Sequence, residues 1–147
     1  MYKRQIPSAY RRATQDFEKF LEDLLAISSL ATSNQCYTQT RAVFLVFRSH
    51  VEPQVALDFA NALPPVLRAI FIEDWKLTSP VTPMPGKEKL LAEVKAVREA
   101  HNFSTDTAIS EVALALRRNM NELDHGLMLQ KLPAEDSQFW KVELPAA

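Results

Sequence analysis

An internal repeat limits what this chain can fold into more than any other feature of its sequence. The segment LPPVLRAIFIEDW, which begins at Leu63, has a shorter counterpart in LPAEDSQFW, which begins at Leu132, 69 positions later. The same offset, applied without a gap, aligns Leu21 with Leu90, Leu25 with Val94, Val43 with Val112 and Arg48 with Arg117. Self-similarity over such a period is typical of repeated supersecondary units. We therefore expect two pseudo-equivalent halves.

The balance of glycine and proline favours helices over strands. The chain has 2 glycines and 9 prolines, and it lacks the Asn-Gly and Asp-Gly pairs on which tight β-hairpins depend. Apolar residues recur at three- and four-residue steps, as from Phe17 to Leu25, which is the period of an amphipathic helix. The sequence therefore predicts an all-α bundle of seven or eight helices, made of two pseudo-repeated helical halves.

Changes in composition divide the chain into four parts. Residues 1–13 form a basic N-terminal arm, residues 14–77 the first helical repeat, and residues 87–147 the second. Between the repeats, residues 78–86 read TSPVTPMPG, and three prolines in nine residues predict an extended and stiff linker. We expect the two repeats to pack as one domain.

Prolines and capping residues predict where the helices begin. We expect helices over residues 14–30 and 35–49, the second buried on all sides, and further helices that start at Pro53 and Pro65, where a missing N–H costs nothing. The candidates for N-caps are Thr14, the turn 32–34, Ser104 and Asn121. In the helix that follows Asn121, the residues expected to face inward are Leu123, Leu127 and Met128.

Composition narrows the class of protein. The chain of 147 residues contains no apolar run of the roughly 18 residues that a membrane span needs, and its basic N-terminus lacks the apolar core of a secretory signal. A net charge of −1 and a single basic cluster, Lys3, Arg4, Arg11 and Arg12, argue against nucleic-acid binding. The single Cys36 fits a reducing compartment. We expect a cytoplasmic protein with neither a nucleic-acid nor a membrane partner.

The sequence offers few groups for chemistry. It contains no GxSxG, HExxH or CxxC motif and no glycine-rich phosphate loop. Its three histidines, His50, His101 and His125, lack neighbours at metal-ligand spacing, so we expect no metal, no cofactor and no catalytic residue. Arg48 and Arg117, which the repeat relates, are expected to complement a helix C-terminus.

Three stretches carry a resemblance to a known family: FLEDLL at Phe20, LPPVLRAIFIEDW at Leu63, and LPAEDSQFW at Leu132. With them, residues 16–142 resemble the prokaryotic domain of unknown function DUF2267. The resemblance implies a helical, internally repeated domain without an assigned activity, and it transfers no catalytic residue. In one departure between the copies, Glu135-Asp136-Ser137 replaces the VLR of the first block. We expect the second copy to make any contact of this element differently.

Three functions from different classes stay open. The first is a non-catalytic interaction or adaptor module, with a homodimer as one form, whose candidate surface is Phe71, Trp75, Phe139 and Trp140. The structural alternative for these aromatics is to pack the repeats against each other. The second function is the binding of a small apolar ligand between the halves. The third is an enzyme that brings His125 together with Asp58 or Glu52.

Overall fold

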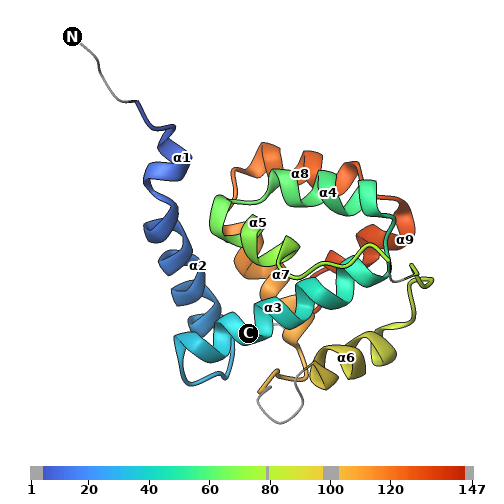
Figure 1. Ribbon diagram of the computed structural model, residues 1–147. Coiled ribbons are helices and arrows are strands. Elements are labelled where there is room, and N and C mark those ends of the chain that lie inside the picture. The colour runs from blue at the N-terminus through green and yellow to red at the C-terminus, as the bar shows by residue number, and fades with distance from the viewer. Residues whose placement is uncertain (1–4, 79, 98–102, 145–147) are drawn as a thin grey trace.

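The computed structural model describes residues 5–78, 80–97 and 103–144, and within these ranges the chain is helical and has no strand. This confirms the predicted all-α bundle (Figure 1). No helix in the described ranges is long and apolar enough to span a membrane. The elements are α1 (Ser8–Arg11), α2 (Ala13–Ile27), α3 (Ser33–Ser49), α4 (Pro53–Ala62), α5 (Pro65–Ile72), α6 (Lys87–Ala96), α7 (Ala108–Arg118), α8 (Glu122–Gln130), α9 (Ala134–Ser137) and the 3₁₀ helix η2 (Gln138–Trp140).

Several helices begin at the signals that the sequence carries. Thr32 caps α3, since its hydroxyl oxygen accepts a hydrogen bond from the Gln35 N–H at 3.1 Å. The Asn121 side chain caps α8 in the same way, with the Leu123 N–H at 2.9 Å. Pro53 and Pro65 stand in the first turns of α4 and α5. These caps and prolines set the residues at which α3, α4, α5 and α8 begin.

Two predicted caps are wrong. Thr14 lies inside α2, which starts at Ala13 because the chain runs on from α1 with hardly a break. Ser104 precedes α7, whose N-cap is Thr107. There the threonine hydroxyls turn to a buried carboxylate instead: Thr105 and Thr107 donate to Glu111 at 2.6 and 2.7 Å. The stronger charge-assisted bonds replace a conventional side-chain cap.

The inward face predicted for α8 is also wrong in part. Met128 is buried, but the side chains of Leu123 and Leu127 are 69% and 44% exposed. The reason is the position of α8, which lies alongside α4 at the edge of the bundle (Figure 1), so that α4 covers a narrow stripe of it. Periodicity alone indicates an apolar face but not how much of that face a neighbour covers.

The two halves are interlocked through their first and second helices. The first helix of the first half, α2, packs against α7, and the first helix of the second half, α6, packs against α3. The second helices α3 and α7 contact each other, and so do α4 and α8 (Figure 1). One hydrophobic core therefore includes residues from both halves.

Burial recurs along the chain at nearly constant spacing. Apart from Thr40, the buried residues of α3 from Gln39 to Phe47 correspond to the buried residues of α7 from Ala108 to Leu116, 69 positions later. In the first helices the spacing is 70: Phe20 and Leu24 are buried in α2, and Leu90 and Val94 in α6. By burial, the ungapped alignment is therefore off by one residue in the first helix of each half, and the repeat itself stays a prediction.

Candidate binding groove

Three of the four aromatics expected at an interaction surface are core residues. Phe71, Phe139 and Trp140 are buried, and Trp75 is half-buried. The Trp140 ring stacks on Phe59 with centroids 5.0 Å apart, and Phe139 lies 5.0 Å from Phe47. Large rings from both halves thus pack against each other, which is the structural alternative that the sequence left open, and these three side chains are almost fully covered.

Arg48 binds the backbone at the end of α5, next to this aromatic cluster. Its guanidinium donates to the carbonyl oxygens of Phe71 and Glu73, at 2.7 and 2.9 Å, and lies 5.6 Å from the centre of the Trp75 ring. Arg48 thus complements the C-terminal end of α5 rather than that of its own helix, and it holds Trp75 in place. Arg117 is exposed instead, so the two arginines differ in role.

Of the candidate enzyme residues, His125 lies on α8, Asp58 on α4 and Glu52 at the N-cap of α4. In the described part of the chain no hydrogen bond or ion pair joins His125 to Asp58 or Glu52; burial and the nearby Arg117 lower the pKa of His125. Cys36 is buried, and burial raises the pKa of its thiol, which disfavours the reactive thiolate. Within the same ranges no three His, Cys, Asp or Glu residues are placed to hold a metal ion.

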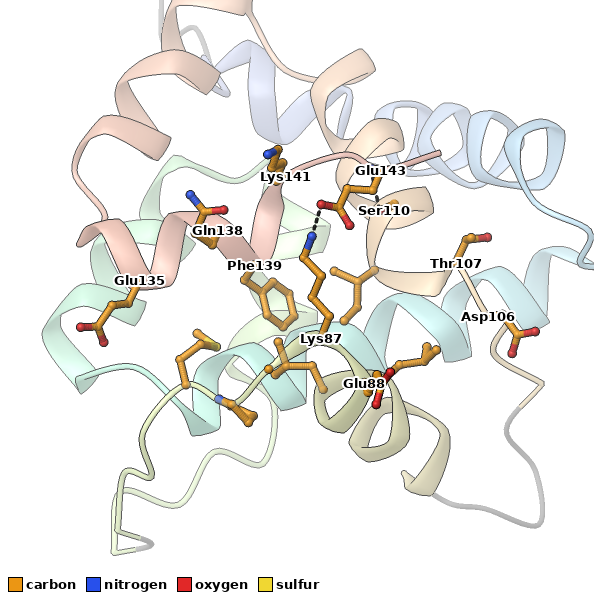
Figure 2. A pocket seen from close by; sticks show the side chains of 16 residues that line it. Lys87, Glu88, Asp106, Thr107, Ser110, Glu135, Gln138, Phe139, Lys141 and Glu143 are labelled. Carbon is orange, nitrogen blue, oxygen red and sulfur yellow. Dashed lines mark hydrogen bonds and ion pairs between the residues drawn. The ribbon is translucent and has the colours of Figure 1, made fainter. Parts of the chain in front are cut away.

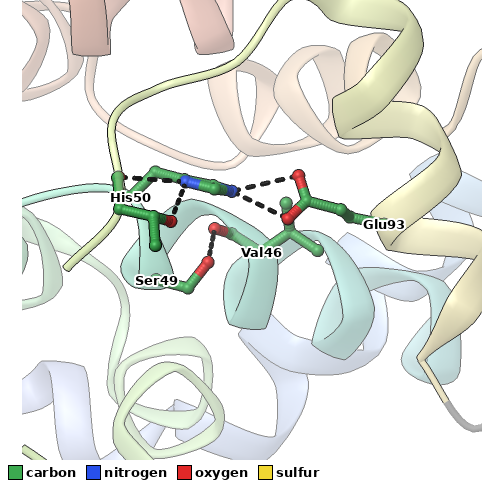
Figure 3. Close-up of polar contacts among 5 residues, drawn as sticks. Val46, Ser49, His50 and Glu93 are labelled. Atoms are coloured by element: carbon green, nitrogen blue, oxygen red, sulfur yellow. Dashed lines mark hydrogen bonds and ion pairs between the residues drawn. The ribbon is translucent and has the colours of Figure 1, made fainter. Parts of the chain in front are cut away.

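His50, at the C-cap of α3, forms a clasp between the linker and α6 (Figure 3). Its Nδ1 lies 2.9 Å from the Thr82 hydroxyl and 3.1 Å from the Thr82 carbonyl oxygen. Its Nε2 lies 3.0 Å from both carboxylate oxygens of Glu93. This arrangement fixes the middle of the Pro-rich linker against α3 and joins α3 to α6.

Asn119, at the C-cap of α7, forms a second clasp of the same kind. It lies 69 positions after His50, and its side-chain amide donates to Asp23 of α2 at 2.8 Å. Asp23 in turn lies 70 positions before Glu93. Burial raises the pKa of Asp23, but the hydrogen bonds from Lys19 and Asn119 outweigh it and leave that pKa lowered. Each clasp therefore joins the second helix of one half to the first helix of the other.

A groove of about 510 Å³ opens in the second half (Figure 2). It lies between α6, the N-terminal turn of α7, and the stretch from α9 to Glu143. Lys87 and Glu143 form an ion pair across it, and the Glu143 N–H donates to the Ser110 hydroxyl at 3.0 Å. The apolar residues of its lining are Met84, Leu90, Leu91, Ile109 and Phe139. The charged residues are Lys87, Glu88, Asp106, Glu135, Lys141 and Glu143.

The predicted repeat relates two charged residues of the groove to apolar side chains of the first half. In the first half α2 packs on α5, and Phe17 and Val66 line a gap of about 10 Å³ there. Lys87 follows Phe17 by 70 positions, and Glu135 follows Val66 by 69. Both charged residues line the much larger groove of the second half.

This groove does not lie between the halves, where the ligand cavity was expected; a smaller hollow of about 350 Å³ does lie there, between α4 and α8, and the expected ligand site stays a prediction. Every residue that lines the groove lies between Met84 and Glu143, within the second half and the end of the linker. Of these residues, only Phe139 belongs to a candidate surface predicted from the sequence. The signal that could have found them is the departure at Glu135-Asp136-Ser137, which marks the element of the second copy that faces the groove.

Within the described residues, fold and groove together define an all-helical, interlocked bundle with a groove of about 510 Å³ in its second half. The family of uncharacterized conserved proteins DUF2267 matches residues 17–139, so the chain belongs to this family. This confirms the resemblance carried by the three sequence blocks. A search of curated proteins finds no match to the sequence.

Proposed function

We propose that this protein is a non-catalytic interaction module, acting in the cytoplasm, that binds a short segment of protein chain in the groove. The observation that carries the proposal is the groove itself. Its volume of about 510 Å³ falls within the roughly 300–1,000 Å³ of typical ligand sites. An apolar floor with a charged rim matches the anatomy of surfaces that bind protein segments.

The rim indicates the chemistry of the segment. Four carboxylates and two lysines line the groove, and one lysine is already paired, since Lys87 contacts Glu143. Asp106 is paired with Lys95, whereas Glu88 and Glu135 have no ion pair within the described ranges. A segment with one or two large apolar side chains and a neighbouring cation suits this lining, because the cation would meet an unpaired carboxylate at the rim.

Labelled peptides of eight residues test the proposal by fluorescence anisotropy. The panel carries Leu or Tyr at two positions, flanked by Arg in one set and by Glu in the other. We expect the Arg-flanked peptides to bind in the micromolar range and the Glu-flanked ones to bind at least about tenfold more weakly. The preference should shrink as salt rises, because exposed charges are screened.

A variant that fills the groove supplies the control. Gly86 lines the groove at the N-cap of α6, with φ −70° and ψ 168°, and a Cβ added there meets no atom within 4 Å. Gly86→Phe should therefore keep the fold and abolish peptide binding. Gly126→Phe makes the same change on the exposed side of α8, away from the groove, and should bind as the wild type does. Equal binding by both variants would contradict the proposal.

Binding of a small apolar ligand is the second candidate, and the volume of the groove favours it as well. The uncharged dye Nile red separates the two functions. If no peptide of the panel binds, but the dye binds to the wild type and not to Gly86→Phe, the groove serves small apolar molecules. If neither probe depends on position 86, both candidate functions fall.

A further inference from the structure

The described part of the N-terminal arm exposes apolar and basic side chains. Helix α1 has no buried residue, and the side chains of Ile6 and Tyr10 are each 55% exposed. The hydroxyl of Tyr10 accepts one long hydrogen bond from Arg68, at 3.4 Å. Arg11 and Arg12 follow, and the first acidic residue of the chain is Asp16.

The arm and the groove lie on opposite sides of the molecule. In Figure 1, α1 extends from the far end of α2, whereas α6 and α9, which border the groove, lie across the bundle from it. The arm therefore cannot fill the groove of its own chain. It can reach the groove of a second copy.

The chemistry of the arm complements that of the groove. The arm offers one aliphatic and one aromatic side chain next to two arginines, and the groove offers an apolar floor with unpaired carboxylates at its rim. At the end of the groove beside α9, Glu135 lines the groove and has no ion pair within the described ranges. A guanidinium placed there would pair with this carboxylate.

We propose that the arm of one copy docks in the groove of a second copy, with Ile6 and Tyr10 on the apolar floor and Arg11 and Arg12 at the rim beside Glu135. This inference rests on the proposed function, because it names the segment that the groove binds. It also gives the module a means of self-association. The exchange of two arms between two molecules forms a closed dimer with two identical contacts.

The association should be weak for one contact and stronger for two. A short arm covers less surface than the roughly 1,200 Å² that stable interfaces bury in total. Two arms in one dimer act together, since the second contact forms within the complex that the first has made. We expect a monomer–dimer equilibrium at micromolar concentration that shifts toward monomer in high salt.

Sedimentation velocity of the full-length chain over a concentration series tests the proposal. The wild type should form dimers, whereas Gly86→Phe, with its filled groove, and the double variant Ile6→Ser/Tyr10→Ser should each weaken association at least about tenfold. Gly126→Phe leaves both the arm and the groove unchanged. This control should dimerise as the wild type does. A wild type that stays monomeric, or variants that all dimerise equally, would overturn the proposal.

A mixture of the two defective chains tests the mode of docking. Gly86→Phe retains an intact arm, and Ile6→Ser/Tyr10→Ser retains an open groove, so together they can form one arm-to-groove contact. The mixture should contain a heterodimer, at lower affinity than the wild-type dimer, that neither chain forms alone. If the mixture stays monomeric while the wild type dimerises, arm exchange is wrong.

The peptide panel separates this failure from that of the proposed function. If the Arg-flanked peptides bind to the groove of the wild type but the chain does not self-associate, the groove binds a foreign segment and the inference of a second copy falls. If neither peptide binding nor self-association depends on an open groove, both the proposed function and the inference of arm exchange are wrong.

Discussion

Asp136 is a buried carboxylate at a position where the first half has a core leucine. It lies 69 positions after Leu67, and its side chain, like that of Leu67, is almost entirely covered. Burial is the largest cause that raises its pKa, followed by repulsion from Glu135 and Glu52. The charged form of Asp136 is therefore less favourable in the folded chain than in water.

Replacement of this carboxylate should stabilise the protein at neutral pH. Because the pKa of Asp136 is raised in the folded state, folding favours the protonated form, and stability falls as pH rises from the ordinary value of 3.8 through the folded value. Asp136→Asn removes this loss. We expect a gain on the order of 1 kcal/mol in the free energy of unfolding at pH 7 and no gain from this source at pH 3.

Urea denaturation at the two pH values measures the effect. Glu18→Gln, which neutralises an exposed carboxylate on α2, is the matched control and should change stability little at either pH. If Asp136→Asn destabilises the chain at pH 7, the carboxylate makes a favourable interaction that outweighs its burial.

Between helices, two clasps join the halves. His50 with Glu93 links α3 to α6, and Asn119 with Asp23 links α7 to α2. Double-mutant cycles with alanine should give a coupling free energy of about 1 to 3 kcal/mol within each pair, because each bond involves a carboxylate. His50 and Asn119 belong to separate clasps, so their effects should add to within about 0.5 kcal/mol.

The cycles are measured by urea denaturation at pH 7. Gln54 and Asp58 form a bond of similar length, 2.9 Å, within the exposed face of α4, and this pair is the control. Its coupling should be below about 0.5 kcal/mol, since neighbouring side chains on one helix surface contribute little. If the coupling free energy in either clasp is as small as in this pair, other contacts set the packing of these helices and the clasp itself adds little stability.

Most of the helices could be predicted from the sequence, because their signals are local. Proline at the starts of α4 and α5 and the Thr32 and Asn121 caps act within one turn. The predictions of N-caps at Thr14 and Ser104 were wrong. The preceding helix α1 decides where α2 begins, and the buried carboxylate of Glu111 decides where α7 begins. The clasps join residues far apart in sequence, such as His50 and Glu93, and spacing does not indicate them.

The groove could be predicted in part. The sequence shows that Glu135-Asp136-Ser137 departs from the apolar stretch of the first block, and this element does border the groove. The size and place of the groove depend on how α6 lies against α3 and apart from α9, which is a tertiary property. The aromatics around Trp140 were open to two interpretations because a large ring suits a core and an interface equally well.

At the scale of the whole molecule, the two halves are interlocked, so neither half contains a complete hydrophobic core. The first helix of each half has its main partner in the other half, since α2 packs on α7 and α6 on α3. The rings of Phe47 and Phe59, from the first half, contact Trp140 from the second. A half on its own would expose these surfaces to water, at roughly 25 cal/mol for each Å² of apolar area.

We therefore expect the protein to unfold in one cooperative transition. Urea curves followed by tryptophan fluorescence, which reports on Trp75 and Trp140, and by far-ultraviolet circular dichroism should coincide. Chains of residues 1–77 and 87–147 should each have little stable helix alone and should gain helix when mixed, because mixing restores the partners of α2 and α6. Two separate transitions, or a half that folds alone, would show instead that each half has a sufficient core and that the clasps join two finished domains.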